Sequence, residues 1–210
     1  MKNLKRLGVL LTAAGAICLM TNIHPVKAAE GVTIADGVYI GNVNVSGMTE
    51  KQAQSAVEEY VAGLMDTTFT LKGESGSVSM TAQDMGVSAD VNTAVTEAVA
   101  LGRAGSLINR YKTTEDLKKQ PVVLDMHLSV DKQATAQKLY KDSDKLSVAA
   151  VDNGLTRENG AFQFVKGKEG VEVNIVDSVY AINDFLAEEW DGTNNEIELV
   201  TDVVEPRGNE

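Results

Sequence analysis

Ser129 and Lys132 form an S-x-x-K sequence, the clearest nucleophile pattern in the chain. In serine acyl-transfer enzymes, a lysine at this spacing lowers the cost of deprotonating the serine hydroxyl. Such enzymes also carry K-T-G and S-D-N sequences. Neither occurs here, and the segment 112–114 reads K-T-T. We therefore interpret the pair as the end of a strand followed by the start of a helix.

Cysteine and histidine are scarce. Cys18 and His24 both lie near the N-terminus, and His127 is the only other residue of either type. No G-x-S-x-G sequence accompanies His127, which we expect to be a surface residue of an alternating strand. If the N-terminal segment is removed, the remaining chain can form no thiol nucleophile, disulfide or Cys/His zinc site.

Paired acidic residues occur at 58–59 and 188–189. Neighbouring positions on a helix point to different sides, so neither pair makes a glycosidase-type carboxylate pair by itself. The segment 191–196 carries oxygen ligands at alternate positions, but it lacks the twelve-residue calcium loop, and we interpret it as a helix-to-strand turn. We predict no catalytic residue, no metal site and no cofactor.

Basic residues gather at one place in an acidic chain. Residues 102–112 contain Arg103, Arg110 and Lys112 together with Tyr111. Because an arginine can hold a carboxylate through two parallel hydrogen bonds, Arg103, Arg110 and Tyr111 are candidate ligand-binding residues. The same segment also fits a corner between two helices, with glycines breaking the chain and cations neutralising helix C-termini. Both interpretations remain open at this stage.

Composition restricts the class of protein. The chain has 210 residues, 43% of them hydrophobic and 23% charged, with 19 basic and 30 acidic residues and a net charge of −11. This hydrophobic fraction is typical of a globular protein and argues against a wholly disordered chain. A chain this acidic would repel nucleic-acid phosphates, so we expect no nucleic-acid partner.

The N-terminus has the pattern of an export signal. Basic residues at 2, 5 and 6 precede an uncharged, mostly apolar run over 7–20, and Val26 and Ala28 suit a signal-peptidase site. We expect a signal peptide at 1–28. Because a run of 14 is shorter than the ~20 residues that cross a bilayer, we expect this segment to be cleaved. The alternative is an uncleaved anchor, which is the only membrane contact expected. Cleavage would leave 15 basic and 30 acidic residues, a net charge of −15.

Hydrophobic patterns in the first half predict both helices and strands. Thr49 followed by Gln52 is typical of a capping box, so we expect a helix to begin after Thr49. Asn92 is expected to cap a later helix. The other elements expected here are a strand at 37–45, a hairpin at 69–80 and a short helix at 106–117.

The second half repeats this order. Alternating apolar residues predict one continuous strand at 122–130, and Asp131 is expected to open a helix with Tyr140 facing inward. Phe162 and Phe164 suggest that this half has the better-filled core. The later elements expected are a strand at 171–175, a helix capped by Asp177 or Ser178, and a final strand at 197–203.

Several matching positions lie 84 residues apart, among them Gly76 with Gly160 and Gly86 with Gly170. Together with the repeated element order, this offset predicts a duplication. We expect an α+β fold of two similar mixed α/β repeats, each with an antiparallel or mixed sheet packed by helices. The predicted boundaries are 29–118 and 119–206, with a tail at 207–210 that we interpret as the truncated start of a further domain.

Three segments resemble the putative peptidoglycan-binding domain family. They are GVYIGNVNVSGMT at 37–49, GVSADV at 86–91 with AVALGRAG at 98–105, and GVEVN at 170–174. That module is found ahead of VanW-type and L,D-transpeptidase domains in Gram-positive cell-envelope proteins. The resemblance implies a duplicated α+β module that positions an attached domain on the cell wall, and residues 203–210 look like the lead-in to a VanW domain.

The resulting prediction is an exported, non-catalytic module that binds peptidoglycan in the cell envelope. Since glycan strands offer hydroxyls and amides, such binding needs a polar groove between the repeats. The alternative is a structural spacer or protein-interaction module that binds an envelope protein and no glycan. A third hypothesis is a hydrolase that uses dispersed carboxylates.

Overall fold

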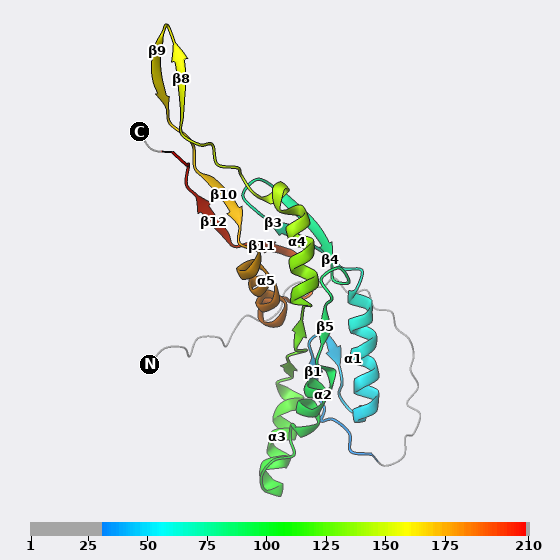
Figure 1. Ribbon diagram of the computed structural model, residues 1–210. Helices are drawn as coiled ribbons and strands as arrows, with labels where there is room; N and C mark the ends of the chain where they lie inside the picture. Colours follow the sequence, from blue (N-terminus) through cyan, green and yellow to red (C-terminus); the bar gives the residue numbers. More distant parts are fainter. Residues whose placement is uncertain (1–30, 209–210) are drawn as a thin grey trace. The chain divides into compact units, whose positions relative to one another are not determined.

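The described residues form helices and several small antiparallel or mixed sheets, giving the α+β class that the sequence predicts (Figure 1). The computed structural model describes residues 31–208, and the predicted signal peptide at 1–28 lies outside them. The described residues from Val32 onward form one compact unit. Within residues 31–208, no helix is both long and apolar enough to cross a membrane.

The first helix begins at the predicted capping box. Strands β1 (Val38–Ile40) and β2 (Val43–Asn44) form a tight antiparallel pair that precedes α1 (Glu50–Leu64). The backbone N–H of Gln52 donates to Thr49 Oγ1 at 3.4 Å, and the backbone N–H of Thr49 donates to Gln52 Oε1 at 2.9 Å. The box therefore satisfies two donors that a helix start leaves unpaired.

The predicted first hairpin is confirmed, and it is buried on one face. Strands β3 (Thr68–Lys72) and β4 (Ser77–Thr81) pair so that Phe69 lies opposite Met80 and Leu71 lies opposite Val78. All four side chains are in the core. Strand β11 (Glu196–Glu198) adds to the outer side of β3 in the parallel direction, so the sheet has the order β11-β3-β4.

Two helices follow the short strand β5 (Ser88–Ala89), namely α2 (Val91–Ala100) and α3 (Leu107–Lys119). The prediction that Asn92 caps α2 is wrong. Asp90 is the cap, because its carboxylate accepts the backbone N–H of Thr93 at 3.1 Å and the Thr93 hydroxyl at 2.8 Å. The Asn92 side chain instead accepts a hydrogen bond from Gln54 on α1.

The prediction of one strand over 122–130 is also wrong. The segment forms β6 (Val122–Leu124), parallel to β1, and β7 (Leu128–Ser129), antiparallel to β5. Between them His127 has a φ of 52°, and its backbone N–H donates to Asp125 Oδ1 at 2.9 Å. This turn moves the chain from one sheet to another while Met126 and Leu128 stay buried, so apolar alternation continues across a broken strand.

Helix α4 (Lys132–Leu146) begins at Asp131 as predicted, since that carboxylate accepts two backbone N–H groups. Its inward face is formed by Thr135, Leu139 and Leu146. Tyr140 is 74% exposed, so the prediction that it faces inward is wrong. Tyr140 follows Leu139 by one position, which turns it about 100° around the helix.

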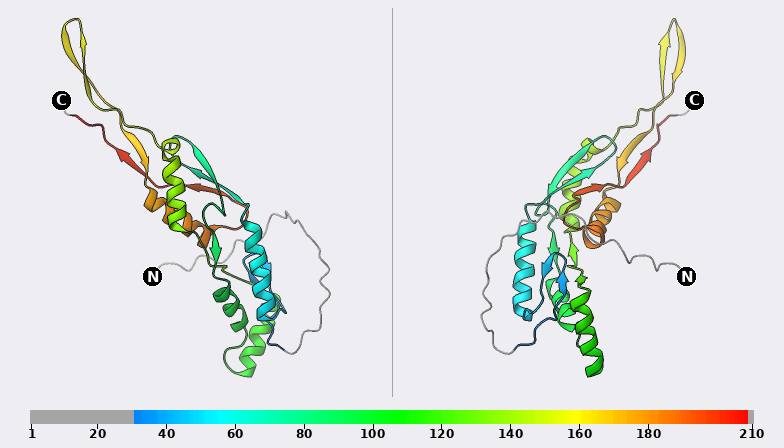
Figure 2. Two further views of the ribbon diagram at one scale, coloured as in Figure 1. Left: turned by 45° about the vertical axis from the view of Figure 1, so that its right-hand side comes forward. Right: turned by 180° about the vertical axis from the view of Figure 1, so that it is seen from behind.

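The second hairpin consists of β8 (Gly154–Glu158) and β9 (Ala161–Val165). The two strands pair only with each other, and all positions of β9 are exposed. Figure 2 shows the yellow hairpin extending past β10 and β12 with no helix against either face. The second half therefore does not have the better-filled core, because Phe162, which was expected to supply it, is 72% exposed.

The last segment forms more elements than predicted. Strand β10 (Gly170–Val173) leads into α5 (Ile175–Asp184), which ends in the π-helical turn η1 (Phe185–Glu189). Asn174 caps α5, not Asp177 or Ser178, because its side chain accepts the backbone N–H of Asp177 at 3.0 Å. The single strand predicted at 197–203 is two strands: β11 joins β3, and β12 (Thr201–Val204) joins β10.

One hydrophobic core joins both halves of the described chain. Three strand pairs cross from residues before 119 to residues after it: β1 with β6, β3 with β11, and β5 with β7. The core therefore depends on the two halves being folded together. The duplication itself stays a prediction.

Candidate functional site

The first candidate site is a surface hollow of about 420 Å³ that we call the cationic depression. Its basic residues are Arg103, Arg110 and Lys118. The remaining walls come from the segment before β1, the end of α2 and one face of α3, with the residues Thr33–Asp36, Gly47, Leu101, Gly102 and Thr114.

Backbone carbonyl groups hold both arginines in the cationic depression. Arg103 Nη2 donates to the Thr33 carbonyl at 2.6 Å, and Arg110 Nε donates to the Gly105 carbonyl at 3.0 Å. A guanidinium group carries five N–H donors, so each arginine keeps further donors for a ligand. Both residues are exposed. The two side chains are thus held in position and still have N–H donors for a ligand.

Lys118 adds a third cation. Its ammonium group lies 3.0 Å from Glu115 Oε1, and this hydrogen bond, with a smaller contribution from the charge of Asp36, raises the pKa of Lys118. Lys118 therefore stays protonated at neutral pH. Arg110, Thr114 and Lys118 follow one another at intervals of four on α3, so helical spacing in the sequence is the signal that places Lys118 on the same face as Arg110.

Only two of the three predicted binding residues meet here. Tyr111 is exposed but is not among the residues that line the cationic depression. The corner between two helices is real, with Gly102 and Gly105 at positive φ. Its cations do not neutralise helix C-termini, however, because Arg103 donates to Thr33 and Arg110 lies in the first turns of α3.

The second candidate site is a hollow of about 520 Å³ that we call the polar groove. Residues from both halves line it, and a groove between the two halves is where the sequence predicts a glycan site. One side comes from the β1–β2 turn and α1, and the other from the β6–β7 break and the end of η1. The lining residues are Gly41, Asn42, Tyr60, Val123–Met126, Leu128, Ala187, Glu188 and Trp190–Gly192.

Hydrogen bonds connect the two sides of the polar groove. Asn42 Nδ2 donates to the Tyr60 hydroxyl at 3.0 Å and to the Asp191 carbonyl at 3.5 Å. Two contacts hold the Trp190 side chain. Its Nε1 donates to Asn195 Oδ1 at 3.0 Å, and its ring packs against Phe69 at a centroid distance of 5.4 Å. The walls of the groove are therefore held in place by the protein itself.

Asp191 is organised by its own turn. Its Oδ1 atom accepts the Thr193 hydroxyl at 2.7 Å and the backbone N–H groups of Thr193 and Asn194 at 2.8 and 3.3 Å. These bonds, led by the Thr193 hydroxyl, lower the pKa of Asp191 below its ordinary value. Residues 191–195 thus form the turn that leads into β11, as interpreted from sequence. Over residues 31–208, no group of three or more acidic, histidine or cysteine residues could hold a metal ion.

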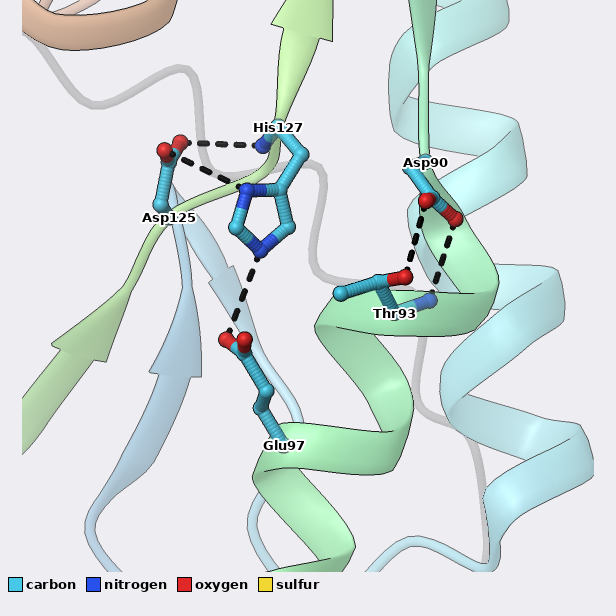
Figure 3. A network of polar contacts seen from close by, with 5 residues as sticks. All are labelled: Asp90, Thr93, Glu97, Asp125 and His127. Carbon is cyan, nitrogen blue, oxygen red and sulfur yellow. Dashed lines mark hydrogen bonds and ion pairs between the residues drawn. The ribbon is translucent and has the colours of Figure 1, made fainter.

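His127 lies at the break between β6 and β7, next to the polar groove (Figure 3). Its Nδ1 is 3.5 Å from Asp125 Oδ2, and its Nε2 is 3.4 Å from Glu97 Oε2. The expectation of a strand residue is wrong, because His127 lies in the turn between β6 and β7. Its side chain is 32% exposed and bridges α2 to this turn. The pKa of Asp90 is lowered mainly by its hydrogen bonds to Thr93, with a smaller electrostatic contribution from His127.

The S-x-x-K residues do not form a nucleophile site in this part of the chain. Ser129 Oγ lies 3.3 Å from Ser88 Oγ, and Lys132 Nζ lies 4.1 Å from the centroid of the Tyr180 ring. Each group is directed to a different partner. The pair is thus a strand end and a helix start, as interpreted.

A sequence profile of the family described as "Putative peptidoglycan binding domain" matches residues 78–194, which is more than half of the chain. The chain belongs to this family. Membership indicates peptidoglycan binding, and with it a place in the cell envelope. The match includes all three basic residues of the cationic depression and the second-half wall of the polar groove. No curated protein and no solved structure matches the chain.

Proposed function

We propose that this protein is exported and binds peptidoglycan without catalysis, using the cationic depression to hold carboxylates of the stem peptides. The observation that carries the proposal is the meeting of Arg103, Arg110 and Lys118 in one hollow within the family match. Peptidoglycan stem peptides present free carboxylates, which are the groups that arginine binds best.

The cationic depression is a local positive region in an acidic chain. A chain with a net charge of −11 repels anionic ligands at long range. At physiological ionic strength charges are screened beyond about 8 Å, so a carboxylate close to the arginines would feel mainly their local positive charge. Anionic wall polymers that carry many phosphates would still be repelled by the acidic residues on the rest of the surface.

The non-catalytic part of the proposal rests on how the reactive groups are used. His127 contacts carboxylates on both ring nitrogens, and the Ser129 and Lys132 side chains are directed to separate partners. These contacts support a binding role. Release of soluble wall fragments by the pure protein would revive the hypothesis of a hydrolase with dispersed carboxylates.

A sedimentation assay with purified cell-wall sacculi tests the proposal. The double variant Arg103→Ala/Arg110→Ala is expected to lose about tenfold or more in affinity, since hydrogen bonds to charged groups contribute about 1.5–3 kcal/mol. The matched control is Arg157→Ala/Arg207→Ala, which removes the same charge outside the depression. Equal losses in both variants, or no binding by the unmodified protein, would overturn the proposal.

The second candidate function is a protein-interaction module of the envelope. The observation that favours it is the exposed apolar face of the β8–β9 hairpin, where Leu155, Phe162 and Phe164 lie together. In that case the protein would copurify with an envelope partner and would not sediment with sacculi. We also propose a Gram-positive, VanW-like setting. It is supported by the family resemblance and by residues 203–210, which look like the lead-in to a VanW domain.

A further inference from the structure

We infer that the polar groove binds the neutral amino-sugar backbone of peptidoglycan, as a second subsite beside the one for stem carboxylates. This inference rests on the proposed function, because it assigns a second part of the same polymer to a second hollow. It is carried by the charge of the groove, by its aromatic and amide walls, and by the way those walls are held.

The charge of the polar groove is opposite to that of the cationic depression. Asp125, Glu188 and Asp191 line it, and its lining contains no Lys, Arg or His among the described residues. Carboxylates of stem peptides and phosphates of other wall polymers would be repelled here. A ligand that fits must present hydrogen-bond donors without negative charge, as the hydroxyl and acetamido N–H groups of an amino sugar do.

The polar groove also supplies apolar surface for the faces of sugar rings. Tyr60 and Trp190 contribute aromatic rings, and Val123 is exposed beside them. The volume of about 520 Å³ falls within the range of about 300–1,000 Å³ typical of small-molecule sites. A hollow with apolar walls and a few placed polar groups is suited to a pyranose, which has apolar C–H faces and a polar rim.

Contacts within the protein hold the polar groups of the groove in position before a ligand binds. The Tyr60 hydroxyl accepts from Asn42, so its own hydrogen remains available to a sugar oxygen. Gly192 keeps the loop close to Asn42, because its φ is +86° and a Cβ built there would lie 2.9 Å from Asn42 Nδ2. A site fixed in this way would lose little conformational entropy on binding.

The test uses a neutral β-1,4-linked N-acetylglucosamine oligomer and isothermal titration calorimetry on the full chain. Glu188→Gln replaces a carboxylate acceptor with an amide NH2 donor, and Tyr60→Phe removes the hydroxyl. Each change is expected to weaken oligomer binding about tenfold. Glu189→Gln is the matched control: it changes the same charge on the neighbouring residue, which does not line the groove. Thermal unfolding of each variant checks that it is folded.

Three outcomes separate this inference from the proposed function. Oligomer binding that is lost in the groove variants but kept in Arg103→Ala/Arg110→Ala supports the inference. Sacculus binding without any oligomer binding overturns the inference and leaves the proposed function standing. Tighter binding of a lysine-containing cationic peptide than of the oligomer, with strong salt dependence, also overturns it, because the groove would then be an ammonium site.

Discussion

The two hairpins of this protein have similar sequences of apolar residues and opposite surroundings. In β3–β4, Phe69 and Leu71 lie in the core, with β11 added alongside β3. In β8–β9, Leu155 pairs with Phe164 and Arg157 pairs with Phe162, and this apolar face is exposed. Alternation along a strand tells which residues share a face, but not whether another element covers that face.

The similarity extends beyond the hairpins. Strands β4 and β9, and helices α2 and α5, each begin 84 residues apart and have equal lengths. On this basis we propose that 29–118 and 119–206 are two repeats. The strand pairing differs between the two halves. In the first half β2 pairs with β1, which precedes it, whereas in the second half β7 pairs with β5 and not with β6, which precedes it. On this proposal, the two hairpins are the same element in a covered and in an uncovered setting.

The largest effect is expected from truncating the buried hairpin. Phe69→Ala should lower the free energy of unfolding by about 3–5 kcal/mol, because it removes a core aromatic ring that also packs on Trp190. Phe162→Ala, which truncates an aromatic side chain of the exposed hairpin, should change it by no more than about 0.5 kcal/mol. Urea unfolding followed by tryptophan fluorescence measures both. Similar losses in the two variants would remove the distinction between the hairpins.

A second prediction compares Gly73, in the turn of the buried hairpin, with Gly154, the first residue of β8. Gly73→Ala should cost about 1–3 kcal/mol, since a Cβ there would lie 2.5 Å from the Leu146 carbonyl oxygen. Gly154→Ala has open space around the new Cβ, so stability should stay the same or rise by up to about 1 kcal/mol. Thermal unfolding midpoints compare them. A destabilising Gly154→Ala would show that the exposed hairpin is covered in solution.

A third prediction concerns acid stability at the end of the buried hairpin. Asp84 pairs with Lys138 on α4 and accepts the backbone N–H of Thr81, and the pKa of Asp84 is lowered by these contacts, first by Lys138. Its stabilising contribution is complete above its ordinary pKa of 3.8 and is lost as pH falls through the lower folded value. Asp84→Asn should therefore flatten the pH dependence of stability below about pH 5.

Acid titrations of the urea midpoint give the measurement for Asp84→Asn. Glu158→Gln, at the turn of the exposed hairpin, is the control, and it should leave the slope of the profile unchanged. If both variants flatten the profile equally, the acid sensitivity reflects net charge and not the contact between Asp84 and Lys138.

The smallest effect is expected from the one cation–aromatic contact of the exposed hairpin. Arg157 lies 5.7 Å from the centroid of the Phe162 ring. Because this contact is exposed, Arg157→Ala should cost about 0.5 kcal/mol, compared with Lys166→Ala as a control for charge. Hydrogen exchange of the β8–β9 amides reports the change locally. A loss above about 1 kcal/mol in global stability would mean that this hairpin unfolds with the core.

Local chemistry predicted much of the secondary structure. The capping box at Thr49, the cap at Asp131 and the hairpin at 69–80 depend on nearby residues, and all are confirmed. The break at His127 depends instead on two sheets that only the folded chain brings together, so alternation alone suggested one strand. Arg103 and Arg110 meet for a similar reason: the Thr33 carbonyl that holds Arg103 comes from 70 positions earlier.

The parallel pairing of β3 with β11 bears on how the protein is made. It places Thr70 opposite Glu196, 126 positions further along the chain. Such distant contacts slow folding, because a long loop must close before they form. While the nascent chain is being synthesised, the free edge of β3 has no partner until residues 196–198 emerge. Termination before that point would leave an open sheet edge, which is a template for aggregation.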